Sequence, residues 1–212
     1  MADDETDVPY GEDFHDSVTA EAWAEAAFQK RPWRATIFDQ FVSIVGSAAV
    51  ARPRILELGS GPGFLAEQIL ERCPSVKVYT LLDFSEAMLD QSRRRLERHA
   101  ARAQFLRADF KTETWSERVS GTFDFVVSLQ AVHELRHKRH APQLYAQLPA
   151  LLSPSAEVLI CDHLPAGAHT PRHRVLYMSV AENRAAFEQA GFAHVELVWS
   201  EHEMAFYRAR LR

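Results

Sequence analysis

The chain alternates between short apolar runs and longer segments in which apolar residues recur every three or four positions. The helical repeat covers residues 63–72, 85–99, 141–152 and 179–190, and the apolar runs lie at residues 55–58, 76–82, 105–107, 123–128 and 158–161. Such runs are typical of buried strands, and strands that alternate with helices form parallel sheets covered on both faces. The sequence therefore predicts an α/β fold.

The C-terminal end predicts a different connection. Residues 194–199 and 204–209 are two strand-like runs, and only residues 200–203 join them. Because so short a link cannot contain a helical crossover, the two runs predict an antiparallel hairpin.

Two amphipathic helices are expected ahead of the first strand. Asp16 or Ser17 can cap the first helix, and Pro32 suits the first turn of the second. The apolar face of the second helix consists of Trp33, Ile37, Phe41, Ile44 and Ala48. We expect a mobile acidic leader over residues 1–15, an N-terminal helical cap over 16–50 and the main domain over 51–212.

Charge is distributed unevenly along the 212 residues, which include 29 Asp and Glu against 24 Lys and Arg. Residues 1–29 contain nine of the acids and no Lys or Arg. So acidic a start is unlike a secretory signal or a transit peptide, and no run approaches the roughly 18 apolar residues of a membrane span. The net charge of -5 is untypical of nucleic-acid binding, and Cys73 and Cys161 fit a reducing compartment. We expect a cytoplasmic protein with no membrane or nucleic-acid partner.

The strongest local signal is the loop after the first strand, Ile55-Leu56-Glu57-Leu58-Gly59-Ser60-Gly61-Pro62-Gly63. Alternating glycines permit a tight turn and let a ligand lie against the backbone. The third glycine comes one residue too early for a dinucleotide-binding fingerprint, and the Lys-Ser/Thr ending of a nucleotide-phosphate loop is missing. With Glu57 ahead of the first glycine, the loop resembles motif I of the class I S-adenosylmethionine-dependent methyltransferases.

The resemblance continues at the ends of the following strands. It implies that Asp83 binds the ribose hydroxyls of the donor, that Phe84 packs against adenine and that Asp109 binds the adenine amino group. Residues 123–133 resemble the fourth-strand motif beside the methionine moiety. The implied donor contacts are Glu57, Gly59, Gly61, Gly63, Asp83, Phe84, Met88, Asp109, Phe110 and Gln130.

The same resemblance implies the fold and the cofactor. In this family the sheet is Rossmann-like with strand order 3-2-1-4-5-7-6, and the antiparallel seventh strand lies between the fifth and the sixth. The methyl donor is S-adenosylmethionine, and the methyl group moves by in-line displacement from an activated sulfonium.

Three residues at the ends of the fourth and fifth strands are candidate catalytic groups. His133 is the first candidate for a general base, because it is expected near the methyl group and an imidazole can titrate near neutral pH. Asp162 and His163 are the second choice. A base is needed only where the acceptor starts protonated, as a hydroxyl or a thiol does.

We expect a small-molecule acceptor, with a protein or RNA acceptor as the alternative. The fourth strand leads into Ser128-Leu129-Gln130-Ala131. Enzymes of this fold that methylate base amino groups or glutamine amides usually have Asn/Asp-Pro-Pro-Tyr/Phe there, which disfavours that class. The cap offers four aromatic residues to line an acceptor site, namely Trp23, Phe28, Trp33 and Phe38.

A competing function is suggested by His133-Glu134-Leu135-Arg136-His137, which matches the H-E-x-x-H signature of zinc peptidases. On a helix the two histidines would share a face and bind zinc, with Glu134 activating water. The extended signature fails, because His140 and Gln143 stand where Gly and His are required. Glu157, a distant candidate ligand, opens a strand-like run. We therefore predict no metal site.

Overall fold

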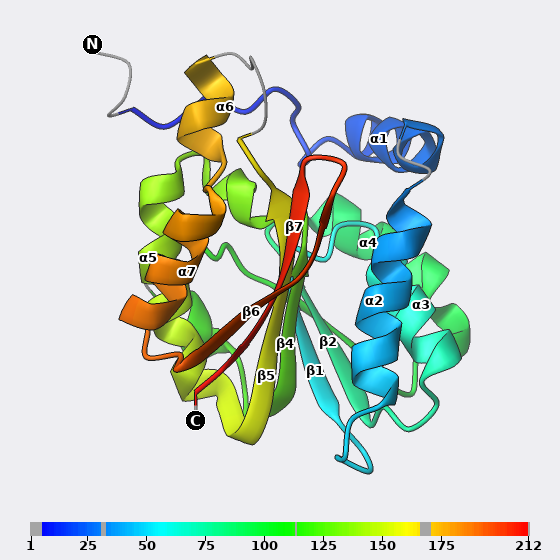
Figure 1. Cartoon of the computed structure of the whole chain (residues 1–212). Helices are drawn as coiled ribbons and strands as arrows, with labels where there is room; N and C mark the ends of the chain where they lie inside the picture. The colour runs from blue at the N-terminus through cyan, green and yellow to red at the C-terminus, as the bar shows by residue number, and fades with distance from the viewer. Residues whose placement is uncertain (1–5, 31–32, 113, 166–170, 212) are drawn as a thin grey trace.

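A computed structural model describes residues 6–30, 33–112, 114–165 and 171–211, with the backbone alone at 28–30 and 171–173. Seven strands form one sheet in the order β3-β2-β1-β4-β5-β7-β6, which confirms the expected α/β methyltransferase-like topology (Figure 1). The strands are β1 (Arg54–Leu58), β2 (Val78–Asp83), β3 (Ala103–Arg107), β4 (Phe123–Leu129), β5 (Leu152–His163), β6 (His194–Glu201) and β7 (Met204–Arg210).

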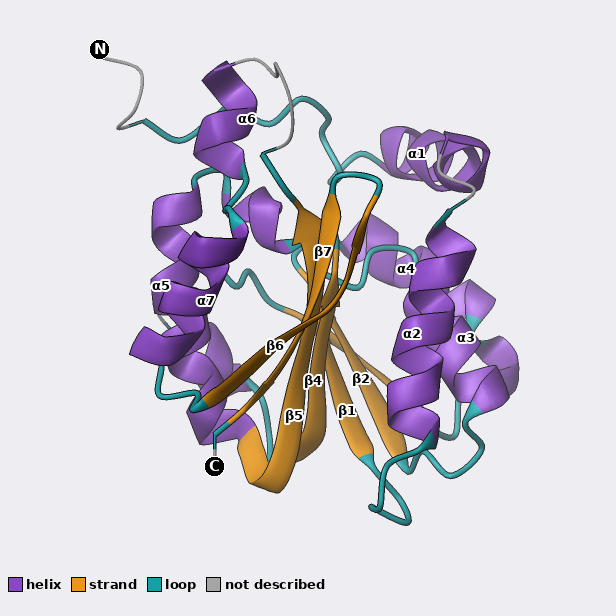
Figure 2. Cartoon of the chain, viewed as in Figure 1, coloured by secondary structure: helices purple, strands orange, loops and turns teal. Residues whose placement is uncertain are grey.

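Helices cover both faces of this sheet, as Figure 2 shows. The helices are α1 (Ser17–Lys30), α2 (Arg34–Gly46), α3 (Phe64–Arg72), α4 (Glu86–Arg95), α5 (Ala141–Gln147), α6 (Pro171–Leu176) and α7 (Val180–Gln189). Strand residues alternate between two apolar clusters, because successive side chains of a strand point to opposite faces. Ile55 packs in the cluster under α2 and α3, whereas Leu56 packs in the cluster under α5 and α7.

The last strands form the predicted hairpin. β6 and β7 pair antiparallel, and β7 also pairs antiparallel with β5. On this part of the sheet Glu157 of β5 accepts two hydrogen bonds from Arg208 of β7, both at 2.6 Å. Glu157 thus serves as the partner of a strand arginine.

The segment between the fourth and fifth strands differs from the prediction. Instead of one helix over residues 141–152, α5 ends at Gln147, and a 3-10 turn follows at Leu148–Leu151. Pro149 lies in this turn and has no N–H to donate, so it does not extend the α-helix. β5 therefore begins at Leu152, well before the expected residue 158.

The N-terminal part begins with a segment outside regular secondary structure. Residues 6–16 cross the carboxyl edge of the sheet, and Asp16 then caps α1 by accepting the N–H of Thr19 at 2.8 Å. The mobility expected for residues 1–15 stays a prediction, as does the division into three parts, and the expected helix break at Arg31-Pro32 lies outside the described residues. No helix in the described ranges has the length and apolar character that crossing a membrane requires.

The parallel strands direct their carboxyl ends to one edge. Leu58 of β1 pairs with Leu82 of β2, and Leu129 of β4 pairs with Cys161 of β5. The loops that follow these strands consequently meet along this edge, beneath α1. In open parallel sheets this is the edge where ligands bind.

Candidate active site

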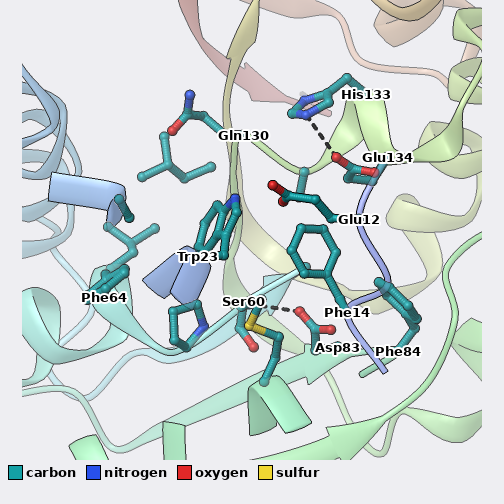
Figure 3. Close-up of a pocket in the computed structure, with 18 of the residues that line it drawn as sticks. Glu12, Phe14, Trp23, Ser60, Phe64, Asp83, Phe84, Gln130, His133 and Glu134 are labelled. Atoms are coloured by element: carbon teal, nitrogen blue, oxygen red, sulfur yellow. Dashed lines mark hydrogen bonds and ion pairs between the residues drawn. The ribbon is translucent and has the colours of Figure 1, made fainter. Parts of the chain in front are cut away.

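A cavity of about 840 Å³ lies at this edge, between the strand ends, α1 and residues 10–14. Its size is in the range of roughly 300–1,000 Å³ that is usual for small-molecule sites. Glu12, Phe14, Trp23, Ser60, Phe84 and His133 are among the side chains around it, as Figure 3 shows.

The glycine loop forms the floor of the cavity, and its glycines serve different purposes. Gly59 has φ +65°, and a Cβ atom there would lie 2.4 Å from Cβ of Ala131 in the loop after β4. Gly61 has φ +53°, and a Cβ atom there would meet nothing within 4 Å. Gly59 is therefore required by protein packing, whereas Gly61 leaves the backbone open to the cavity. Gly63, with φ +81°, is the N-cap residue that precedes α3 and does not line the cavity.

Asp83 lies at the end of β2 directly beside this loop. Its carboxylate accepts the N–H of Gly61 at 2.7 Å and the N–H of Ser85 at 2.9 Å. Burial raises the pKa of Asp83 to about 6, although the backbone N–H groups act in the opposite direction. The structure thus places a carboxylate that titrates near pH 6 against the open glycine.

Of the donor contacts implied around the adenine, the apolar ones line the cavity and the acid does not. Phe84, Met88 and Phe110 line the cavity, and the rings of Tyr10 and His15 lie against Phe84 with centroids 6.3 and 5.1 Å away. Asp109 does not line the cavity: it is exposed, and its carboxylate accepts the N–H of Lys111.

Glu57 is buried at the inner end of the cavity. The hydroxyl of Tyr79 donates to its carboxyl group at 3.0 Å. Burial raises the pKa of Glu57 to about 8, with a smaller opposing effect from the Tyr79 hydrogen bond. Glu57 is therefore mostly protonated at neutral pH, which makes it a neutral hydrogen-bonding group.

Gln130 follows β4 and connects two sides of the cavity. Nε of Arg34, on α2, donates to Oε1 of Gln130 at 2.8 Å, and Nε2 of Gln130 lies 3.0 Å from Nε2 of His163. Because an arginine can only donate, the amide nitrogen must face His163, whose Nε2 then accepts. Gln130 has φ +53°, so a strained backbone holds this amide in place.

His133 lies between two carboxylates. Its Nδ1 is 2.7 Å from Asp162, and its Nε2 is 3.1 Å from Glu134. Burial alone would lower the pKa of His133, but the negative charges and hydrogen bonds of Asp162 and Glu134 raise it to about 10. The expectation that His133 titrates near neutral pH is therefore wrong. In this arrangement it is an imidazolium with no lone pair for an incoming proton.

The H-E-x-x-H match does not form a zinc-peptidase site. Residues 132–135 form a 3-10 turn that ends at Arg136 with φ +66°, so His133 and His137 do not share the face of an α-helix. His137 instead accepts the N–H of Arg139 with its Nδ1. Among the described residues, the set of potential ligands within 4.8 Å of one another is His133, Asp162 and His163. Hydrogen bonds within this set account for its close spacing.

Comparison with known proteins agrees with this geometry. Residues 55–155 match the family model described as a methyltransferase domain. The chain is 38% identical over 89 residues to a malonyl-[acyl-carrier protein] O-methyltransferase of Paenibacillus sp. (strain JDR-2), covering 41% of this chain and 31% of the relative.

A second relative matches over most of the chain. It is a malonyl-[acyl-carrier protein] O-methyltransferase of Geobacter sulfurreducens, 30% identical over 202 residues, which cover 87% of this chain and 70% of the relative. Among solved structures, an O-methyltransferase family protein from Burkholderia thailandensis superposes with a TM-score of 0.71 at 18% identity, over 92% of this chain and 60% of that one. The chain belongs to the class I S-adenosylmethionine-dependent methyltransferase family.

The residues around the cavity fit the donor of this family. Asp83 offers a buried carboxylate for ribose hydroxyls, and Gly61 leaves room for a ligand against the backbone. The hydroxyl of Ser60 is buried with no hydrogen-bond partner among the described residues, so it is available to a ligand. These three residues, with Phe84 and Met88, would hold the adenosine part.

The aromatic residues of the cap divide between two roles. Trp23 and Phe38 line the cavity, as expected. Trp33 stacks on His202 of the β6–β7 turn, with ring centroids 5.8 Å apart, and does not line the cavity. The side chain of Phe28 lies outside the described residues. Sequence reasoning missed several further lining residues, namely Tyr10, Glu12, Phe14, Arg34, Ser60, Arg136 and Tyr177.

Proposed function

We propose that the protein transfers a methyl group from S-adenosylmethionine to a small-molecule acceptor by in-line displacement. The observation that carries the proposal is that one cavity has the glycine loop and Asp83 in its walls together with Trp23, Arg34 and Tyr177. A donor held by the glycine loop and Asp83 leaves the space near Trp23, Arg34 and Tyr177 for an acceptor.

The donor supplies a methyl group that its sulfonium already activates, so the protein mainly has to align the acceptor and exclude water. Alignment of two reactants contributes on the order of 7–11 kcal/mol in favourable cases. Trp23 and Phe38 provide apolar walls, and the Arg34–Gln130 hydrogen bond provides a fixed polar edge.

A proton on the acceptor requires a base, and the geometry favours His163 among the three candidates. His133 is an imidazolium, and the charge of that imidazolium holds the pKa of Asp162 below its usual range against the opposing effect of burial. The Nε2 of His163 faces the Gln130 amide and lines the cavity. We assign Nε2 of His163 as the base that takes the proton of the acceptor, after the acceptor has displaced the Gln130 amide from this nitrogen.

The relatives support a small-molecule or acyl acceptor. Two of them are named for malonyl-[acyl-carrier protein], and the chain spans only 31% of one and 70% of the other. The acceptor of this protein is therefore proposed as a class, not as the molecule named for its relatives. A protein or RNA acceptor is the alternative.

The test is a transfer experiment with methyl-labelled donor. The protein is incubated with a metabolite extract, with protein and with RNA, and the label is counted in each fraction. We expect label in the small molecules and at least a tenfold loss for Asp83→Ala, with Asp90→Ala, an exposed acid of α4, as the matched control. Label confined to protein or RNA would replace the proposal with its alternative.

A further inference from the structure

Residues 6–16, here called the strap, cover one side of the cavity. Tyr10, Gly11, Glu12 and Phe14 of the strap line it, and Figure 3 shows Glu12 and Phe14 among Trp23, Asp83 and Glu134. The strap contains no helix or strand, and its side chains are exposed except for the half-buried Val8 and Phe14. A segment that buries so little apolar surface opens at low free-energy cost.

The strap is attached to the domain at three places. The carboxylate of Asp7 lies 2.9 Å from Arg139, 2.8 Å from His140 and 3.4 Å from Lys111. At the far end Ser85 donates to the carbonyl of Phe14. The Asp7 attachment consists of contacts with side chains near the surface, whereas the Phe14 attachment is a hydrogen bond from the buried Ser85.

Arg136 makes the central attachment. Its carbonyl accepts the N–H of Val8 at 2.8 Å, and its guanidinium donates to the carbonyls of Val8 at 3.0 Å and Pro9 at 2.6 Å. The same guanidinium lies over the ring of Tyr10, 5.0 Å from the centroid. Only 5% of Arg136 is exposed, so the strap and the domain enclose this charge between them.

The guanidinium of Arg136 also reaches the catalytic side of the cavity. It donates to Glu134 at 3.0 Å, and Glu134 lies 3.1 Å from Nε2 of His133, whose Nδ1 faces Asp162. The backbone N–H of Arg136 donates to the carbonyl of His133 at 3.1 Å. One buried cation thus connects the strap to the ion pairs that position His133.

We propose that the strap opens to admit and release the donor, and that Arg136 is a positioning residue that transmits strap closure to His133. This inference rests on the proposed function, because the cavity under the strap is the donor site. When the strap closes, Arg136 is fixed by the two carbonyls and holds Glu134 against His133. When it opens, those two donors lose their partners, and Glu134 is held less firmly.

Dissociation of S-adenosylhomocysteine tests the opening step without any acceptor. Stopped-flow tryptophan fluorescence, to which Trp23 contributes, gives the dissociation rate. We expect Asp7→Asn to raise this rate about fivefold and Arg136→Gln about tenfold, while the exposed control Arg94→Gln stays within twofold. S-adenosylhomocysteine should also slow chymotryptic cleavage at Tyr10 and Phe14 in the unaltered protein at least fivefold.

Histidine ring signals in NMR test the transmission step. Arg136→Gln should shift the ring signals of His133, and Asp7→Asn should move them part of the way. Arg136→Lys keeps the charge toward Glu134 but cannot hold both carbonyls, so it should dissociate ligand as fast as Arg136→Gln and should move the His133 signals part of the way, as Asp7→Asn does.

Two results would overturn the inference. If Asp7→Asn and Arg136→Gln leave the dissociation rate unchanged, the strap does not control ligand release. If both variants speed dissociation but leave the His133 signals unmoved, Arg136 does not transmit strap closure to His133. Failure to bind S-adenosylhomocysteine at all would instead refute the proposed function. A variant that does not fold is replaced by Tyr10→Ala, which removes the ring beneath the guanidinium together with its contact with Phe84.

Discussion

The carboxylate of Asp162 accepts two hydrogen bonds from His133, one from Nδ1 at 2.7 Å and one from the backbone N–H at 2.9 Å. The end of β5, which contains Asp162, and the turn that contains His133 are thereby fixed to each other. The arrangement also selects the charged form of the imidazole. A residue type chosen for its ability to titrate near neutral pH is here held in its charged form at neutral pH, because Asp162 and Glu134 raise its pKa to about 10.

The first prediction concerns this charge. In Asp162→Asn the largest favourable charge beside His133 is lost, so the pKa of His133 should fall from about 10 toward its ordinary value. Glu134 and Arg136, together with His163 and Tyr177, are the other groups that face His133. Histidine NMR titration measures the change, and the exposed Asp90→Asn is the control. An unmoved pKa would show that Asp162 does not set the charge.

The second prediction concerns donor affinity. Asp83→Ala should weaken binding of S-adenosylhomocysteine by about 1.5–3 kcal/mol, since charge-assisted hydrogen bonds to the ribose are lost. Asp109→Ala is the matched control, because the structure places this acid outside the cavity. Calorimetry measures the affinities. Equal losses of affinity in the two variants would reject the claim that Asp83 binds the donor and Asp109 does not.

The pH dependence of the same binding gives a third prediction. The pKa of Asp83 is about 6, and only the ionised carboxylate accepts from both ribose hydroxyls. Affinity for S-adenosylhomocysteine should therefore fall as the pH drops below about 6. In Asp83→Asn this decline should disappear, which calorimetry between pH 5 and pH 8 can establish.

The fourth prediction concerns stability. The folded-state pKa of Glu57 is about 8, above its ordinary 4.5, so protonated Glu57 stabilises the fold at low pH and this contribution is lost as the pH rises from about 4.5 to 8. In Glu57→Gln the loss is absent. The free energy of unfolding of the variant minus that of the unaltered protein should grow by about 1.4 kcal/mol per pH unit over this range. Urea unfolding at several pH values measures this difference. A difference that did not change with pH would contradict a raised pKa for Glu57.

The final prediction separates two glycines. Gly59→Ala places a Cβ 2.4 Å from Ala131 and should destabilise the fold by about 1–3 kcal/mol, as overpacking does. Gly61→Ala meets no atom within 4 Å, so it should cost only the backbone strain, of order 1 kcal/mol, but should weaken donor binding. Equal effects of both changes on stability and binding would refute the assignment.

The strands and the glycine loop could be predicted because they depend on local sequence. Apolar runs mark the buried strands, and the motif loops follow them directly. The first half of β5 escaped prediction, since residues 152–157 include serines, a proline and a glutamate. This polar stretch pairs with β4 at Leu152 and Glu157, with an irregular register between them, so backbone pairing and not an apolar pattern makes it part of the strand.

The charge network could not be predicted, because its members are distant in sequence. Arg34 and Gln130 are 96 residues apart, and Arg136 and Val8 are 128 apart. The charge of His133 depends likewise on Asp162, 29 residues later. No local pattern marks Arg136. In the sequence it occupies only a variable position of the H-E-x-x-H match, which does not form a zinc site.

The contact between Gly59 and Ala131 has a consequence for changing the acceptor. The glycine loop, which we propose holds the donor, and the loop after β4, where we propose the acceptor side begins, have no space between them and must move together. A larger residue at position 131, introduced to reshape the acceptor site, would push on the backbone that holds the donor. Libraries aimed at new acceptors should therefore keep Ala131 and vary the cap, where Trp23 and Phe38 line the cavity.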